Sequence, residues 1–198
     1  MRLAPTPHAE ISPPDGSALL VVDAPNVDAV LGGMLGRAPR RSERFDARAL
    51  STWIARECET SAERTIFTNV PDPLPPGLEG WIKHLVEDGW RVYARPKVRR
   101  DDDIDDAMVA YLSDRPWEKV VVFSHDSACF AAPLTSMARA GTHVTVLGFR
   151  ECAGRLPFLE GVNYIDAEDV PGLYRQAPPR VRIGTLPAAG GWIEQAVV

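Results

Sequence analysis

Ala18-Leu-Leu-Val-Val22 is the stretch of sequence that decides the fold. It is short and continuously apolar, and the polar residues Asp23 and Asn26 follow it closely. A strand with this pattern is buried on both faces, which happens where helices cover both sides of a parallel sheet. We therefore expect a central strand at residues 18–22, with helices packed above and below it.

Comparable apolar runs recur along the chain and alternate with stretches of helical periodicity. We expect further strands at Arg64–Asn69, Trp90–Ala94, Val120–Phe123, Val144–Leu147 and Val162–Ile165. Apolar spacing predicts helices around Ser51–Glu57, after Pro76, over Ile104–Leu112 and over Ala131–Ala140. Strands that alternate with helices indicate right-handed βαβ units. The expected class is α/β, a three-layer α/β/α sandwich with a central, mainly parallel sheet.

Three segments are expected along the chain. Residues 1–17 are rich in proline and predict an irregular leader. The alternating pattern fills residues 18–170, which we expect to form one domain. After about residue 171 the pattern weakens, and prolines with the pair Gly190-Gly191 predict a C-terminal extension over residues 171–198.

Composition narrows the classes of function. The chain has 198 residues with 45% hydrophobic content and a formal charge of −5, which argues against a broad basic face for nucleic acids. The apolar run at residues 18–22 is far too short to span a membrane, and the N-terminus lacks the apolar stretch of a secretion signal. Cys58, Cys129 and Cys152 are scattered and odd in number, so neither a zinc ribbon nor a disulfide framework is indicated. We expect a cytoplasmic protein.

Polar clusters follow three of the expected strands at the ends where the strands stop. They are Asp23-Ala-Pro-Asn26, Asp101-Asp-Asp-Ile-Asp-Asp106 and Ser124-His-Asp-Ser127. The carboxyl ends of parallel strands share one edge of a sheet, so these clusters are expected to meet. Mg²⁺ prefers oxygen ligands, and it can polarise a phosphoryl oxygen and activate water. The residues therefore favour a divalent-metal site and phosphodiester hydrolysis.

Each cluster also has an ordinary structural interpretation. An aspartate after a strand is commonly a turn or helix N-cap residue, which applies to Asp23 and Asp126. Acids such as Asp101 and Asp102 suit a solvated helix start, where they favour the helix dipole. We interpret His125 as a loop or packing residue rather than a base. The coincidence of three acidic clusters at three strand ends is what favours a functional site.

Several familiar sites are missing from the sequence. It contains neither a GxxxxGK[ST] phosphate loop nor a GxGxxG dinucleotide fingerprint, and no GxSxG nucleophile elbow. A response-regulator-like phosphoacceptor would have an acidic pair directly after the first strand, and Asp23-Ala24 does not supply one. These absences disfavour nucleotide-binding, serine-hydrolase and phosphoacceptor functions.

Four segments, in this order and spacing, resemble the NYN domain, a family of the PIN-like nuclease superfamily. They are Leu20–Asn26, Lys97 with Asp103–Asp106, Val122–Asp126 and Gly141–Gly148. Flanking phrases at Phe67–Val70, Ala94–Lys97 and Leu147–Glu151 resemble an actinobacterial branch of that family. The resemblance covers about residues 18–149. It implies a PIN-like sandwich and cleavage of RNA that depends on Mg²⁺ or Mn²⁺.

The resemblance also implies roles for individual residues. Asp23, Asp103 and Asp126 would bind the metal, and Asp106 or its neighbour Asp105 would assist. Asn26 matches the asparagine of the family motif, which would steer the substrate or a metal-bound water.

The sequence departs from the family pattern at one position. The family has a second aspartate just before a phenylalanine, and this chain has Cys129 before Phe130. The domain would then use one ion, draw another carboxylate from residues 101–106, or bind without cutting. The first hypothesis is therefore a metal-dependent endoribonuclease, and the second is a noncatalytic NYN module that binds RNA or a protein partner. Self-association is compatible with both.

The densest basic stretch lies just ahead of the acidic cluster. It contains Arg95, Lys97, Arg99 and Arg100. We predict that these side chains hold the phosphate backbone of RNA without base preference, whereas the ordinary interpretation is a solvated loop.

Charge reversal of Arg99 and Arg100 should weaken RNA binding and flatten its dependence on salt, because fewer counterions are released. Affinity measured over a range of salt concentrations gives the slope. A slope that does not change would refute the role of this stretch.

Overall fold

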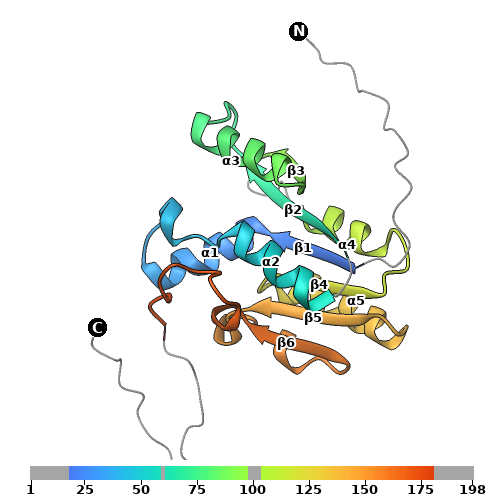
Figure 1. Ribbon diagram of the computed structural model, residues 1–198. Coiled ribbons are helices and arrows are strands. Elements are labelled where there is room, and N and C mark those ends of the chain that lie inside the picture. Colours follow the sequence, from blue (N-terminus) through green and yellow to red (C-terminus); the bar gives the residue numbers. More distant parts are fainter. Residues whose placement is uncertain (1–17, 59–60, 98–103, 181–198) are drawn as a thin grey trace, which may run out of the picture.

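The structure is a computed structural model that describes residues 18–58, 61–97 and 104–180. Its centre is one six-stranded sheet with the order β3-β2-β1-β4-β5-β6 (Figure 1). The strands are β1 (Ala18–Asp23), β2 (Ala62–Val70), β3 (Arg91–Pro96), β4 (Lys119–Phe123), β5 (His143–Gly148) and β6 (Val162–Asp166). All five neighbouring pairs are parallel. The expected α/β class is confirmed.

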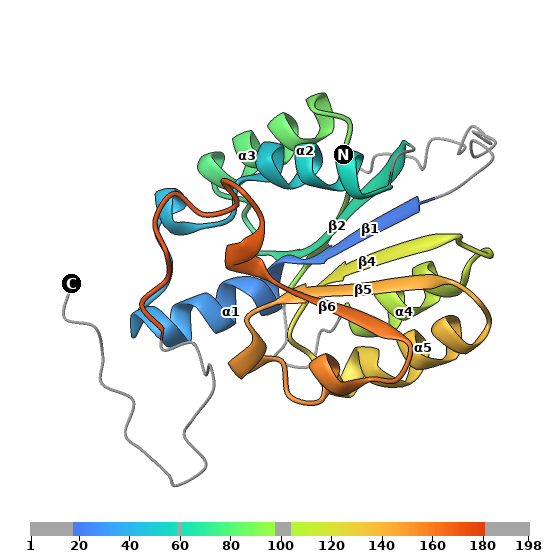
Figure 2. The same ribbon diagram turned by 60° about the horizontal axis from the view of Figure 1, so that its bottom comes forward.

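Helices cover both faces of the sheet and make it the middle layer of three (Figure 2). One face carries α1 (Ala24–Leu35), α2 (Ala47–Cys58) and α3 (Pro76–Glu87), and the other carries α4 (Asp105–Ser113) and α5 (Ser127–Arg139). The short 3-10 helices are η1 (Arg41–Glu43), η2 (Arg150–Cys152), η3 (Leu156–Phe158) and η4 (Ala167–Asp169). The handedness of the crossovers explains which face each helix covers. The chain moves along the sheet in one direction from β1 to β3 and in the opposite direction through β4 to β6, so right-handed connections place the two groups of helices on opposite faces.

The core has two halves that meet at β1, whose six residues are all buried. Leu20 and Val22 pack in the cluster of the α1–α2–α3 face, and Leu19 and Val21 pack in the cluster of the α4–α5 face. Alternate side chains of a strand point to opposite faces, which explains this division. Burial of each such side chain stabilises the fold by roughly 1.5–3 kcal/mol.

Helix α1 was not predicted from the sequence. Pro25 lies in its first turn, where proline costs no hydrogen bond, and the Asp23 side chain caps the helix. Val27 and Leu31, four residues apart, bury against the sheet. The helix ends at Gly36, whose φ of 65° is the left-handed conformation that glycine adopts at little cost. Burial outweighs the weak local signal of a segment that contains proline and two glycines.

A segment after η4 returns across the α1–α2–α3 face, and both views show residues 171–180 beside the loop that precedes α2 (Figures 1 and 2). The Asp46 backbone N–H donates to the Leu173 carbonyl at 2.8 Å, and Leu173 is buried. The predicted leader and most of the predicted C-terminal extension lie outside the described residues. Within the described ranges, no helix has both the length and the apolar character required to cross a membrane.

Candidate functional site

The candidate site lies at the carboxyl edge of the sheet, between β1 and β4. The sheet grows from β1 toward β3 on one side and from β4 toward β6 on the other, so the strand order switches between these two strands. Open parallel sheets bind ligands at such switch points. Asp23 ends β1, and Ser124 directly follows β4, so both residues lie at this point.

Asp23 is fixed by hydrogen bonds at the switch point and is only 3% exposed. Its Oδ2 accepts a hydrogen bond from the Ser124 hydroxyl at 2.8 Å, and its Oδ1 accepts one from the Asn26 backbone N–H at 3.2 Å. A buried carboxylate is costly unless such bonds compensate the lost hydration. The Ser124 bond comes from the loop after β4 and ties the ends of β1 and β4 together, whereas the Asn26 bond comes from the first turn of α1.

Ser124 also connects Asp23 with Asp126. Its hydroxyl oxygen accepts a hydrogen bond from the Asp126 backbone N–H at 3.1 Å. The Oδ1 of Asp126 in turn accepts bonds from the backbone N–H groups of Ala128 at 2.8 Å and Cys129 at 3.0 Å. Asp126 is therefore the N-cap of α5, as Asp23 is the N-cap of α1. The interpretation of both acids as helix caps is correct. The two capping residues are nevertheless connected to each other through Ser124.

Asn26 is held by His125 from the β4 loop. The Asn26 Oδ1 accepts the His125 backbone N–H at 2.8 Å and lies 3.1 Å from the His125 Nδ1. The His125 Nε2 accepts the Phe149 backbone N–H at 2.9 Å, so it carries no proton. The proton of the neutral ring is therefore on Nδ1 and is donated to Asn26. This bond orients the amide and turns its NH₂ group away from His125.

Burial lowers the pKa of His125 to about 4, and the positive charge of Arg180 adds to the effect. The ring is confined on the side of Gly148, where a Cβ would lie 3.1 Å from its Cδ2 and 2.9 Å from the Tyr164 hydroxyl. A larger residue at position 148 would require the Tyr164 and His125 side chains to shift. His125 therefore acts in the structure as a neutral, packed residue that positions Asn26.

The other predicted site residues are placed less centrally. Asp106 is exposed in the first turn of α4. Asp103 lies outside the described residues, as do Asp101 and Asp102. In the described part of the chain, no three His, Cys, Asp or Glu side chains form a group that could hold a metal ion. The structure therefore brings Asp23, Asn26 and Asp126 together, and Asp106 does not complete a metal group with them.

The predicted basic stretch is only partly described. Arg95 and Lys97 are exposed at the end of the edge strand β3, which β2 separates from β1, and Arg99 and Arg100 lie outside the described residues. Cys129, where the resembled family has an aspartate, is half-buried in the first turn of α5 and packs against the α4–α5 core cluster.

An ion cluster beside the site was not predicted. The Arg180 guanidinium is buried, and it forms ion pairs with Glu151, Asp166 and Glu168. It lies 4.9 Å from the centre of the Phe149 ring, which stacks on His125 at 5.3 Å. The C-terminal segment is thereby connected to the site through Phe149. No local pattern in the sequence pairs Arg180 with acids that follow β5 and β6.

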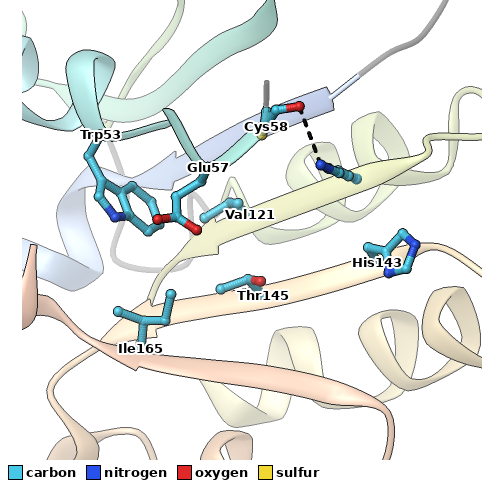
Figure 3. A pocket seen from close by; sticks show the side chains of 8 residues that line it. Trp53, Glu57, Cys58, Val121, His143, Thr145 and Ile165 are labelled. Atoms are coloured by element: carbon cyan, nitrogen blue, oxygen red, sulfur yellow. Dashed lines mark hydrogen bonds between the residues drawn. The ribbon is translucent and has the colours of Figure 1, made fainter. Parts of the chain in front are cut away.

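A separate hollow of about 350 Å³ lies over β4 and β5 on the α2 side of the sheet (Figure 3). Its lining includes Lys119 and His143, the first residues of these two strands, so it reaches the opposite edge from Asp23. The Lys119 ammonium donates to the Cys58 carbonyl at 3.3 Å. None of the predicted site acids lines this hollow, and it is not the candidate site.

Fold and site together define a doubly wound α/β protein with buried polar groups at its switch point. No known family model matches the sequence, and no curated protein matches it.

Solved structures show what the fold is similar to. VPA0982 from Vibrio parahaemolyticus RIMD 2210633, a protein of unknown function, is 17% identical with a TM-score of 0.57, covering 78% of this chain and 94% of its own. YcaC from Pseudomonas aeruginosa, solved with hexane-2,5-diol and covalent acrylamide, is 18% identical over 78% of each chain. Its TM-score of 0.34 is too low to support an argument. The first similarity supports the fold alone.

Replacing His125 by Gln should weaken the acid sensitivity of the fold. The pKa of His125 falls from 6.5 to about 4 on folding, so the unfolded chain binds more protons between these values. The stability contributed by the neutral ring is complete above about pH 6.5 and is lost as the pH falls toward 4. Between about pH 7 and about pH 4, wild type should lose about 3 kcal/mol more than the variant.

Urea unfolding at several pH values measures this difference. Glutamine keeps an acceptor near the position of Nε2 for the Phe149 amide, but it does not titrate. Parallel curves for wild type and variant would mean that the pKa of His125 is the same in the folded and unfolded chain.

Proposed function

We propose that the chain is a divalent-metal-dependent ribonuclease that cleaves RNA phosphodiester bonds at the carboxyl edge between β1 and β4. The observation that carries the proposal is the buried Asp23 carboxylate at the switch point, connected through Ser124 to Asp126. The resemblance of the sequence to the NYN domain adds the expectation that the substrate is RNA.

The donor groups fit Mg²⁺ or Mn²⁺. Asp23 and Asp126 offer carboxylate oxygens, and hard divalent cations take such ligands together with waters and substrate phosphates. Asp103 is the proposed third acid. A bound ion would stabilise charge on the attacked phosphate and lower the pKa of a bound water. The role of Ser124 is to hold the Asp23 carboxylate in place, and His125 orients the Asn26 amide as a hydrogen-bond donor for a substrate oxygen.

A noncatalytic binding module is the second candidate. One observation favours it: Cys129 stands where the family that the sequence resembles has its second aspartate. A module of this kind would keep the fold and an RNA- or protein-binding surface without cleavage.

We also propose that the protein works in the cytoplasm. Its three scattered cysteines build no disulfide framework, which is typical of proteins in a reducing compartment.

Asp23→Asn and Asp126→Asn should each abolish most cleavage of a mixed RNA pool in Mn²⁺ or Mg²⁺. We expect losses of at least about 100-fold, because even the outer partners of metal ligands are worth roughly 10–100-fold. Asparagine still caps a helix, so both variants should stay folded. Asp114→Asn, an exposed change at the end of α4, is the matched control and should keep full activity.

Thermal unfolding gives a second measurement that does not depend on cleavage. Millimolar Mn²⁺ should raise the melting temperature of wild type and of Asp114→Asn, but much less that of Asp23→Asn. Activity that survives Asp23→Asn and Asp126→Asn unchanged would place the cleavage elsewhere. RNA binding by wild type without metal-dependent cleavage would identify the binding module.

A further inference from the structure

A groove of about 880 Å³ lies on the α1–α2–α3 face, between the start of α2 and helix α3. Five arginines line it: Arg40, Arg41, Arg44, Arg48 and Arg175. With two aspartates, the lining has a formal charge of +3, whereas the whole chain carries −5. Positive charge is therefore concentrated in this one concave surface of an acidic protein.

Two of the arginines have carboxylate partners. Arg44 pairs with Asp28 at 3.0 Å, and Arg48 pairs with Asp88 at 3.2 Å. These pairs leave the groove with arginines whose charge is not matched.

Of the other three arginines, Arg40 lies beside Glu43 and its charge helps to lower the pKa of that carboxyl, which leaves Arg41 and Arg175. Both are exposed, and within the described ranges neither forms an ion pair. A guanidinium in this state offers a planar fork of donors that suits phosphate oxygens. The two side chains come from distant parts of the sequence and are brought together by the bond between Asp46 and Leu173.

Aromatic rings line the same groove. Phe45 and Trp81 are half-buried, so each presents part of its surface to the groove. Unpaired bases stack on such rings, and single-strand-binding proteins combine a positive groove with aromatic side chains. A duplex hides the faces of its bases and is recognised across a broad surface instead. The lining therefore favours a single strand.

One lining residue of the groove contacts the strand that ends at the candidate site. The Phe45 ring packs edge-to-face on Phe123 at 5.5 Å, and Phe123 directly precedes Ser124, the partner of Asp23. Arg44 pairs with Asp28 on α1, the helix that Asp23 caps. The contact between Phe45 and Phe123 therefore connects one wall of the groove to the end of β4, where Ser124 binds Asp23.

We propose that this arginine groove binds the phosphodiester backbone of a single-stranded polynucleotide and leads it to the edge near Asp23. The second part of this inference rests on the proposed function, and the first part does not. The groove is distinct from the basic stretch of residues 95–100, because neither Arg95, near the end of β3, nor Lys97, just after it, lines the groove.

Binding to the full chain in EDTA tests the groove without cleavage. The probe is a labelled oligouridylate of about 12 nucleotides, within the range that one small domain covers. The double variant Arg41→Glu/Arg175→Glu should bind about 10-fold or more weakly at moderate salt. Its salt slope should become shallower by about 1.4, since each phosphate contact on a single strand contributes roughly 0.7.

The matched control is Arg56→Glu/Arg139→Glu. It changes the net charge by the same amount on exposed arginines in the last turns of α2 and α5, outside the groove. The control should keep an affinity within about 2-fold of wild type and an unchanged slope. Equal losses in the two double variants would overturn the proposal, because they would report only the net charge.

Competitors identify the ligand. Oligouridylate and oligodeoxythymidylate of equal length should both displace the probe, and tighter binding of the former would mark RNA as the source of the shared phosphate chemistry. Poly-glutamate or a duplex that displaces it equally well would overturn the assignment.

The two proposals fail in different ways. RNA binding that depends on the groove, without metal-dependent cleavage, would refute the nuclease function and support the groove as a binding site. Metal-dependent cleavage by wild type, together with unaltered RNA binding by the Arg41→Glu/Arg175→Glu variant, would refute the groove as a binding site and support the nuclease function.

Discussion

Strand β1 is buried along its whole length, with Leu20 and Val22 against one layer of helices and Leu19 and Val21 against the other. This burial extends to Asp23, the last residue of β1, so its carboxylate must be satisfied by neighbouring groups rather than by bulk water. Asp23 meets this requirement through the Ser124 hydroxyl and the amide that starts α1. The positions of Asp23 and Ser124 in the candidate site follow from this need for hydrogen-bond partners.

Helix capping and site formation are the same arrangement in this protein. Asp23 and Asp126 each cap a helix, and the capping bonds hold their carboxylates. Ser124 joins the two residues through the Asp23 carboxylate and the Asp126 backbone N–H. His125 extends the network, because its neutral ring joins Asn26 to the backbone of Phe149. Order at the switch point therefore depends on uncharged hydrogen bonds as well as on acids.

The C-terminal segment contributes arginines to two charged regions, the ion cluster around Arg180 and the arginine groove. Arg180 is enclosed by three carboxylates and stacks over Phe149, which makes it an anchor for the C-terminal segment. That segment also delivers Arg175 to the arginine groove, where positive charge is in excess. A buried arginine enclosed by acids contributes to the fold, whereas arginines without carboxylate partners can bind anions.

The sequence by itself determined the strands, the α/β class and the positions of Asp23 and Asp126 at strand ends, because these features follow from local patterns of apolar and polar residues. Helix α1 escaped prediction, since Pro25 and two glycines weaken its local signal and only the burial of Val27 and Leu31 secures it. The tertiary structure alone decided that Ser124 joins Asp23 to Asp126, that His125 is neutral, and that Arg41 and Arg175 share one groove. These contacts join residues far apart in the chain, and packing, unlike local periodicity, sets their distances.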